Sequence, residues 1–469
     1  MEQNKGYNEL QKKMILAAVC FASFIGPFQG SMINIALPAI GDTFQINVGL
    51  YGWVSTSYLL TVATLLVPAA RISDIVGRKK VFLTGITGIV ATSIITPLTP
   101  NFYAFLLCQV LNGVCAACIM STTVPIISEI FTGKERGAAF GINTAFVYMG
   151  VSFGPFIGGF VVSYLGWRSL FLMLLIPALL TAYIMYTNMK EDVFGDPNVT
   201  FDKAGTVFYA VSILTFLFGL TRIPETEGFI ISFIGLVLLA GFVMFERKQK
   251  YPVFDVNLFF ENRVFSRSNF ASLFNYASTY AIVFFLSLYL QKVGMIEPKT
   301  AGLILLVQPL VQAIFSPYAG KLSGVISAKY LATLGMLITS FGLLLLTGLQ
   351  KDLYLPYLIF TQIVLGLGIA FFAAPNTNMI MSSVSRKEQG SAGGIMATIR
   401  QIGMVFSMAV AMSSINYYIG GTENLGPDTI DPFLSSMKLT FIICMILCIL
   451  GAALSWSRGN IKQELKSES

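Results

Sequence analysis

The residues able to do chemistry inside the apolar segments of this 469-residue chain are mainly amides and hydroxyls. The sequence contains no histidine, which excludes histidine-based catalytic triads, zinc-protease motifs and histidine proton relays. It also lacks the G-x-x-x-x-G-K-[ST] motif that binds nucleotide phosphates. No Asp or Glu lies near the middle of an apolar segment. We therefore expect uncharged side chains to form hydrogen bonds with a small solute. We expect no catalysis, no cofactor, no metal site and no ATP-driven transport.

Nine polar side chains within or near the ends of these segments are candidates for binding that solute. Each could instead form a hydrogen bond between two helices, and the sequence leaves both roles open. The nine residues are Gln29, Asn34, Tyr58, Gln109, Asn112, Tyr148, Asn376, Arg400 and Gln401.

Arg400 is the one charged side chain among these candidates. It lies eight residues inside its apolar segment, about 12 Å deep at roughly 1.5 Å per residue. A charge at that depth costs roughly 3 kcal/mol unless it is paired, hydrated or extended to the surface. We expect Arg400 to face a water-filled cavity and to favour a neutral or anionic head group on the solute; extension toward the cytoplasmic surface is the alternative. Glu129, just past the inner end of the fourth segment, is a candidate for proton coupling.

The elements that must position these side chains are apolar segments of about 20 residues, the length that spans roughly 30 Å of hydrocarbon. Hydrophobic residues make up 55% of the chain and charged residues 11%, which predicts lipid rather than water as the main solvent. The expected fold class is an all-α integral membrane protein with fourteen spans. The predicted spans are residues 14–36, 50–70, 81–98, 102–124, 138–163, 168–188, 205–222, 228–246, 267–290, 299–320, 328–349, 354–376, 392–419 and 435–457.

Lysine and arginine residues sort by side of the membrane when the N-terminus is placed in the cytoplasm and the spans alternate. Of the 30 residues, 23 then lie in cytoplasmic segments and 6 in external ones, with Arg400 inside a span. This is the positive-inside distribution that a correct number of spans should produce. We expect a multi-pass protein of the plasma membrane, in contact with membrane lipids, with both termini cytoplasmic. The net charge of +7 then indicates no nucleic-acid partner.

The two longest cytoplasmic linkers, residues 189–204 and 247–266, divide the chain into six, two and six helices. The predicted domains are an N-terminal six-helix bundle over residues 1–190, two linker helices with flanking loops over 191–266, and a C-terminal six-helix bundle with a cytoplasmic tail over 267–469. Two six-helix halves with a solute site between them are a recurring architecture of secondary carriers.

The loop after the second segment, residues 70–80, contains Asp74, Gly77, Arg78 and Lys79 in close spacing. A carboxylate at a helix end, a glycine turn and a basic cluster can latch helix ends through dipole and charge-assisted contacts. We expect these residues to act in conformational change; a basic loop with no such role is the alternative.

The fifth segment carries Gly150, Gly154 and Gly158 at spacings of four residues, with Pro155 and Gly159 beside them. This spacing makes a stripe without side chains, along which another helix can approach closely. Pro155 removes a backbone donor and bends a helix. A generic close-packing face is the alternative interpretation.

These two motifs, with two further stretches, resemble those of the major facilitator superfamily, specifically its fourteen-helix drug:proton antiporter branch. The further stretches are residues 29–38 in the first segment and 398–403 in the thirteenth, where Thr398-Ile-Arg-Gln-Ile-Gly403 is similar to T-x-R-Q-[LI]-G. The resemblance implies the major facilitator fold and export of a small, amphipathic solute or drug by alternating access, coupled to proton antiport. It also implies that the glycine motif of the fifth segment is the one that distinguishes antiporters from symporters. We expect the protein to function as a monomer.

The sequence departs from this branch at three positions. Gln29 stands where the branch has a membrane-embedded Asp, Gln109 stands where it usually has an Arg, and Ala70 replaces the first Gly of the loop motif. Two charges that proton-driven members use are therefore absent. The alternatives are a carrier of a metabolite, peptide or lipid-like solute with different or no proton coupling, and a membrane sensor that binds without transport.

Overall fold

The computed structural model describes residues 7–131, 133–194, 202–249, 252–254, 256–323, 325–384, 389–420 and 425–459. Within these residues the chain forms helices and no strand. Fourteen helical segments of this described part are long and apolar enough to cross a membrane, which confirms the predicted number and the all-α fold class. The C-terminal tail, which we expect in the cytoplasm, lies outside the described residues after position 459.

The helices follow one another as the apolar segments predict. The first part of the chain contains α1 (Glu9–Phe44), α2 (Val48–Val76), α3 (Arg78–Ile95), η1 (Thr96–Leu98), α4 (Phe102–Ile130), α5 (Gly133–Leu165), α6 (Ser169–Met173) and α7 (Leu175–Asn188). The middle contains α8 (Lys203–Thr221), α9 (Thr226–Glu246) and α10 (Asn257–Glu261). The last part contains α11 (Arg263–Leu288), η2 (Tyr289–Val293), α12 (Pro298–Leu305), α13 (Val307–Leu322), α14 (Ala328–Leu346), α15 (Leu355–Ser382), α16 (Gln389–Ile419), η3 (Pro427–Thr429) and α17 (Ile430–Ser457).

Short polar residues and glycine set several of these helix boundaries. Asn8, Asn47 and Asn101 each accept a backbone N–H of the first turn of α1, α2 and α4, respectively. These bonds satisfy donors that a helix start otherwise leaves without a partner. Gly77 has a φ of 113°, a conformation that side chains disfavour, and this lets α2 end and α3 begin within one residue. α5, by contrast, continues through Pro155 without a break.

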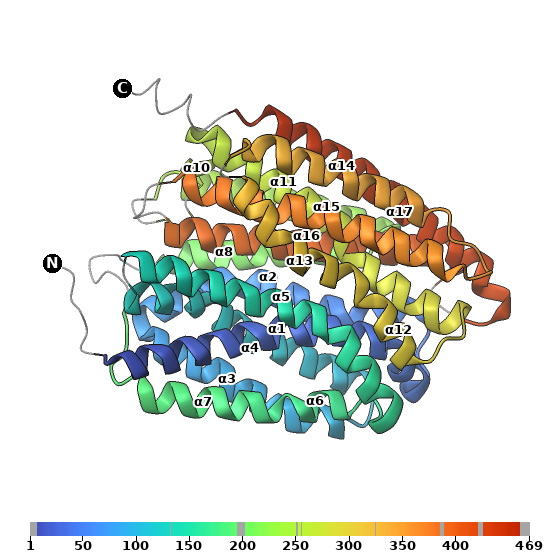
Figure 1. Ribbon diagram of the computed structural model, residues 1–469, viewed down its shortest axis with the longest axis horizontal. Coiled ribbons are helices and arrows are strands. Elements are labelled where there is room, and N and C mark those ends of the chain that lie inside the picture. The colour runs from blue at the N-terminus through green and yellow to red at the C-terminus, as the bar shows by residue number, and fades with distance from the viewer. Residues whose placement is uncertain are drawn as a thin grey trace.

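The helices form two bundles that lie side by side, with the start of α1 and the end of α17 at one end of the molecule (Figure 1). α1 to α7 pack together in the first bundle and α11 to α17 in the second. α8 and α9 pack against each other, and α8 also contacts α2 of the first bundle and α16 of the second. The two linker helices therefore connect with both bundles through α8.

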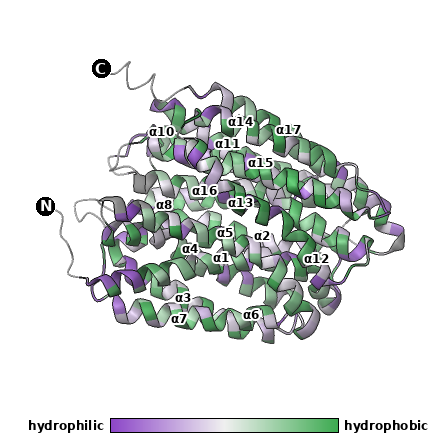
Figure 2. Ribbon diagram, in the orientation of Figure 1, coloured by the Kyte–Doolittle hydropathy of each residue, from purple (hydrophilic) through white to green (hydrophobic). Residues whose placement is uncertain are grey.

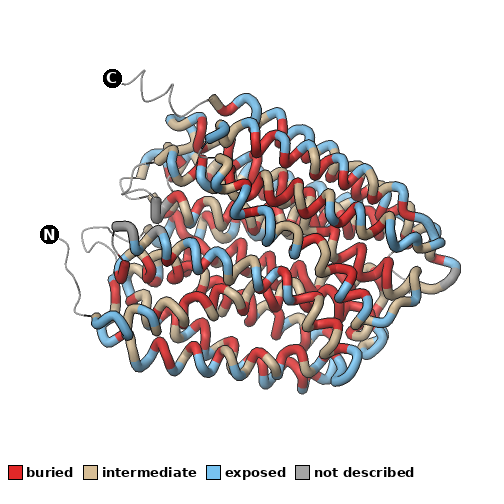
Figure 3. The backbone as a smooth tube through the Cα atoms, viewed as in Figure 1, coloured by how far each residue is buried: buried red, intermediate tan, exposed pale blue. Residues whose placement is uncertain are grey.

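We call the end where α1 begins and α17 ends the basic end, because α2 ends and α3 begins there with Arg71, Arg78, Lys79 and Lys80, and we call the other the opposite end. Between the two ends, apolar residues predominate along the helices (Figure 2). Buried residues lie mainly where helices face one another (Figure 3).

α9 has an extensive exposed apolar surface, which indicates the solvent that surrounds the spans. Phe229, Phe233 and Val237 are exposed along it, and few of its residues are buried. An apolar surface of this extent favours contact with acyl chains over contact with water.

Candidate functional site

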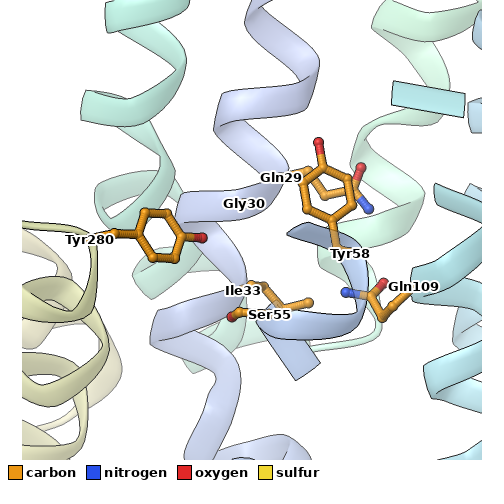
Figure 4. A pocket seen from close by; sticks show the side chains of 7 residues that line it. All are labelled: Gln29, Gly30, Ile33, Ser55, Tyr58, Gln109 and Tyr280. Carbon is orange, nitrogen blue, oxygen red and sulfur yellow. The ribbon is translucent and has the colours of Figure 1, made fainter. Parts of the chain in front are cut away.

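A small pocket lies between the two bundles, where α1, α2 and α4 of the first face α11 of the second (Figure 4). Three of the nine residues predicted from the sequence line it, namely Gln29, Tyr58 and Gln109. The other lining residues are Gly30, Ile33, Ser55 and Tyr280. None of these side chains is a carboxylate or an amine, so the pocket can bind through amides, hydroxyls and aromatic rings.

Gln29 is a polar residue of this pocket whose side chain forms no hydrogen bond. Its side chain is 2% exposed, and neither Oε1 nor Nε2 has a hydrogen-bond partner. Leaving a buried polar group unpaired costs roughly 1–3 kcal/mol. A ligand that presents a donor beside an acceptor would satisfy both atoms, and an amide or imide edge has this arrangement.

Two asparagines do not line the pocket but form hydrogen bonds with residues that do. Asn34 accepts a hydrogen bond from the Ser55 hydroxyl at 3.1 Å and donates to a carbonyl of its own helix. Asn112 donates to Oε1 of Gln109 at 3.4 Å, and Nε2 of Gln109 donates to the carbonyl of Val54 at 3.4 Å. These bonds orient Ser55 and Gln109, so Asn34 and Asn112 act on the pocket through their neighbours.

The two bundles contact each other between the pocket and the opposite end. Ser287 of α11 and Gln291 of η2 donate to backbone carbonyls of α1, at 2.6 and 3.0 Å. Farther out, Lys292 forms an ion pair with Asp42 of α1 at 2.9 Å. These bonds close the pocket from the opposite end.

Toward the basic end, both bundles carry glycines with open surroundings. No atom lies within 4 Å of the position where a Cβ would project from Gly141 of α5 or from Gly394 of α16. In this conformation the pocket leaves no room for a sphere the size of a water molecule. Sites for drug-sized ligands enclose roughly 300–1,000 Å³. A solute of that size therefore requires the bundles to separate further.

Arg400 and Gln401 lie at the bundle boundary but outside the pocket lining. The guanidinium carbon of Arg400 is 5.0 Å from the centre of the Tyr276 ring, and its Nε is buried without a hydrogen-bond partner. Tyr148 of α5 acts on this charge from the first bundle, and none of the groups that do so is a carboxylate. Nε2 of Gln401 lies 3.9 Å from the sulfur of Met120 in α4. Arg400, Gln401 and Tyr148 thus form a second polar region between the bundles.

Asn376 and Glu129 lie away from both of these regions. Asn376 is buried near the basic end of α15, where it accepts a hydrogen bond from Arg458 and donates to the carbonyl of Ser268 at 3.1 Å. Arg458 is 1% exposed, and it also donates to the Ser268 hydroxyl and to the carbonyl of Ala328, each at 3.1 Å. Burial lowers the pKa of Arg458 to about 10, so it is still charged at neutral pH. Asn376 and Arg458 together therefore connect α11, α14, α15 and the end of α17 in the second bundle. Glu129 is exposed at the end of α4.

The residues predicted to form a latch lie at the basic end, where α2 turns into α3. Arg78 donates to Asp74 at 2.9 Å, and Asp192, which follows α7, accepts the backbone N–H of Lys79 at 2.8 Å. A Cβ on Gly77 would collide with the Asp192 carboxyl group, so only glycine permits this approach. These bonds tie the turn to the end of the sixth span within the first bundle.

The glycine stripe of α5 serves two helix contacts. Cβ atoms on Gly150, Gly154 and Gly158 would collide with atoms of α1 in the same bundle. Gly159 faces the second bundle, where its Cβ would lie 3.3 Å from the Cα of Gly302 in α12. The stripe therefore permits close approach both within the first bundle and between the bundles.

Three residues with evident roles in the structure are not indicated by the sequence motifs. Ser55 lies one helical turn before Tyr58, and this spacing is the signal that could identify it as a neighbour on the same face of α2. Arg458 and Glu246 each stand at the end of an apolar segment, where they resemble ordinary flanking charges. Their exposed fractions are only 1% and 0%, which depends on packing between helices and has no sequence signal.

Comparison with known proteins agrees with this architecture. Residues 19–253 and 269–467 match the family model of the Major Facilitator Superfamily. The riboflavin transporter RibZ of Clostridioides difficile is 26% identical over 445 residues, which cover 95% of this chain and 97% of the relative. The multidrug resistance protein Stp of Mycobacterium tuberculosis is 27% identical over 398 residues, which cover 83% and 73% of the two chains. A solved structure of a bacterial homolog of the human lysosomal transporter Spinster, in an inward-facing conformation, has a TM-score of 0.70 at 15% identity and covers 96% of this chain and 97% of that one.

Proposed function

Since the chain belongs to the major facilitator superfamily and is a membrane transporter rather than an enzyme, we propose that it exports small, uncharged, amphipathic solutes by alternating access, in exchange for protons. The observation that carries this proposal is the unpartnered carboxamide of Gln29, in a pocket between the bundles that no charged side chain lines. Relatives named for multidrug resistance and for riboflavin transport support a solute of drug-like or flavin-like size.

A neutral solute suits the pocket better than a cation does. A cation that leaves water needs a carboxylate or several oriented oxygens to replace its hydration. The pocket offers instead one free carboxamide and the rings of Tyr58 and Tyr280. Flat heteroaromatic compounds with an amide or imide edge, riboflavin among them, could pair with Gln29 and contact these rings. Arg400, at the boundary nearby, would favour electronegative groups on the same solute.

The contacts between the bundles fit the proposed export when the protein has the proposed orientation in the plasma membrane. With the basic end in the cytoplasm, as the positive-inside distribution predicts, the contacts of Ser287, Gln291 and Lys292 close the pocket from outside. An exporter takes up its solute in a state that is closed from outside. Release then requires the bundles to separate where α5 meets α12 and to close at the basic end.

Counterflow in liposomes containing the purified protein tests the proposal. We expect labelled riboflavin, or a labelled uncharged drug, to accumulate against unlabelled solute, and we expect an imposed pH gradient to drive its net movement. The permanent cation ethidium should not accumulate. Accumulation of ethidium alone would contradict the neutral class of solute, and binding of a solute without counterflow would favour the sensor.

A further inference from the structure

Two carboxyl groups meet at the basic end, where α8 begins and α9 ends. Oδ1 of Asp202 accepts the backbone N–H of Gly205 at 2.8 Å and so caps α8. Glu246 is the last residue of α9 and is 0% exposed, and its Oε2 accepts the N–H of Phe254 at 3.4 Å. The remaining oxygens, Oδ2 of Asp202 and Oε1 of Glu246, are both buried and have no hydrogen-bond partner.

These two oxygens converge on one point beside Gly205. A Cβ on Gly205 would collide with Oδ2 of Asp202 and with Oε1 of Glu246, so both atoms lie against the space that this glycine leaves empty. Two ionised carboxylates held so close repel each other, and burial removes the water that would stabilise them. One proton on Oε1 of Glu246, donated to Oδ2 of Asp202, would give both oxygens a partner.

Among the described residues, the positive charge that acts on Glu246 is bound to other acceptors. Arg71 of α2 acts electrostatically on Glu246, but its guanidinium donates to the backbone carbonyls of Pro252 and Val253. Among the described residues, the ion pairs include neither Asp202 nor Glu246. In the part of the chain that the structure describes, the charged groups that act on Glu246 are one like charge, Asp202, and one arginine that is bound to carbonyl oxygens.

We propose that Asp202 and Glu246 form a proton-binding site, in which the two carboxyl groups share one proton that is bound and released as the bundles rock. The coupling to transport rests on the proton-driven export proposed above, whereas the binding of the proton does not. Such a site would supply a titratable group that the pocket lacks, because Gln29 and Gln109 cannot ionise.

α8 offers a path from this site to both bundles. The hydroxyl of Tyr209 in α8 donates to the carbonyl of Ala63 in α2 at 3.0 Å, and α8 also contacts α16. The Tyr209 ring stacks on Phe254, which donates to Glu246. Loss of the shared proton would place two negative charges against each other, and the repulsion would move α8 or draw Arg71 from the carbonyls that it holds. Either change alters the contact between α8 and the bundles.

Infrared difference spectroscopy of the full chain in detergent tests the proton itself. We expect a protonated carboxyl band that persists at neutral pH, well above the ordinary range of about pH 4. Glu246→Gln should remove it, because the amide keeps the shape and donates an N–H to Asp202. Asp202→Asn should also remove it while still capping α8. Glu227→Gln, in the exposed first turn of the same helix, is the matched control and should leave the band unchanged.

Transport in liposomes tests the coupling separately. Glu246→Gln should abolish stimulation by a pH gradient and keep counterflow measured without a gradient. A band that survives in Glu246→Gln overturns the site. Stabilisation of the wild type by Na⁺ that depends on Glu246, in the absence of the band, also overturns it in favour of a cation site. A wild-type protein that shows the band but no pH-driven transport keeps the site and overturns proton-coupled export.

Discussion

Gln29 should affect stability and binding in opposite directions, because its carboxamide is buried without a partner in the empty pocket. Gln29→Met keeps the length of the side chain and removes the unsatisfied polar atoms. We expect the solute-free protein to gain roughly 1 kcal/mol of stability and the solute to bind about five- to tenfold more weakly. Thermal unfolding and equilibrium binding of riboflavin to the purified protein measure both effects.

Gln362 provides the control for this substitution. It is also fully buried and does not line the pocket, and its Nε2 donates to the carbonyl of Ile304 at 2.9 Å, so that only its Oε1 lacks a partner. Gln362→Met removes that bond together with the unpartnered oxygen, so it should stabilise the protein less than Gln29→Met does and leave affinity unchanged. Equal losses of affinity in both variants would mean that Gln29 acts through packing alone.

Arg400 should be sensitive to the shape of its side chain as well as to its charge. Its planar guanidinium lies over the Tyr276 ring, and a lysine cannot reproduce that contact. Arg400→Lys should reduce the counterflow rate by at least about tenfold, roughly 1.4 kcal/mol, and nearly as much as Arg400→Ala. Arg247→Lys is the control, because Arg247 lies over Phe260 at the basic end, away from the bundle boundary. Normal transport by Arg400→Ala would refute the proposed role.

Asn376 should contribute to stability and not to solute affinity. Asn376→Ala leaves the buried Arg458 without one of its acceptors, and we expect a loss of roughly 1–3 kcal/mol in unfolding free energy. Arg458→Ala should cost at least as much, and the double variant less than the sum of the two, because both lose the same interaction. Denaturation in detergent measures the stability, and equilibrium binding should show an unchanged Kd. A loss of affinity with unchanged stability would place Asn376 in the solute path.

At the scale of helices, the stripe of α5 determines how closely the bundles approach at the opposite end. Gly159→Ala places a Cβ against the backbone of α12, so the state that is closed at this end should become less populated. We expect a thiol introduced by Ser163→Cys to react about threefold faster or more with an impermeant reagent added outside, a shift of roughly 0.7 kcal/mol.

Gly141→Ala is the matched control in the same helix, because its added Cβ would meet no atom within 4 Å. It should leave the labelling rate and transport unchanged. Equal acceleration by both substitutions would show that the effect comes from the flexibility of α5 and not from its contact with α12.

For the whole molecule, fourteen spans require that the two termini lie on the same side of the membrane, and Figure 1 places the start of α1 and the end of α17 at one end. The positive-inside distribution puts that side in the cytoplasm. A reporter fused after Ser469 should be active when it requires the cytoplasm and inactive when it requires the outside. The reverse result would invert the proposed orientation, and the contacts of Ser287, Gln291 and Lys292 would then close the pocket from the cytoplasm.

Much of the fold could be predicted from the sequence, because the bilayer imposes strong and local rules. A span needs about 20 apolar residues, and every backbone donor within it must be satisfied inside its own helix. The short gaps between predicted spans, at residues 163–168 and 222–228, also appear as helix ends in the structure. The close approach of α1 to α5 likewise follows from glycines four residues apart, because their spacing places them on one helix face.

The site depended on tertiary structure, because polar residues in spans look alike in the sequence whether they bind a solute or another helix. Gln29 and Asn34 lie five residues apart in α1. Gln29 lines the pocket without a hydrogen-bond partner, whereas Asn34 lies outside the lining and accepts a hydrogen bond from Ser55. Asp202 and Glu246 are 44 positions apart and stand at different helix ends, and only the packing of α8 on α9 brings their oxygens together. The sequence by itself determined the spans and the family, since these depend on local hydrophobicity and short motifs. Only the packing of the helices decided which polar atoms were left without partners.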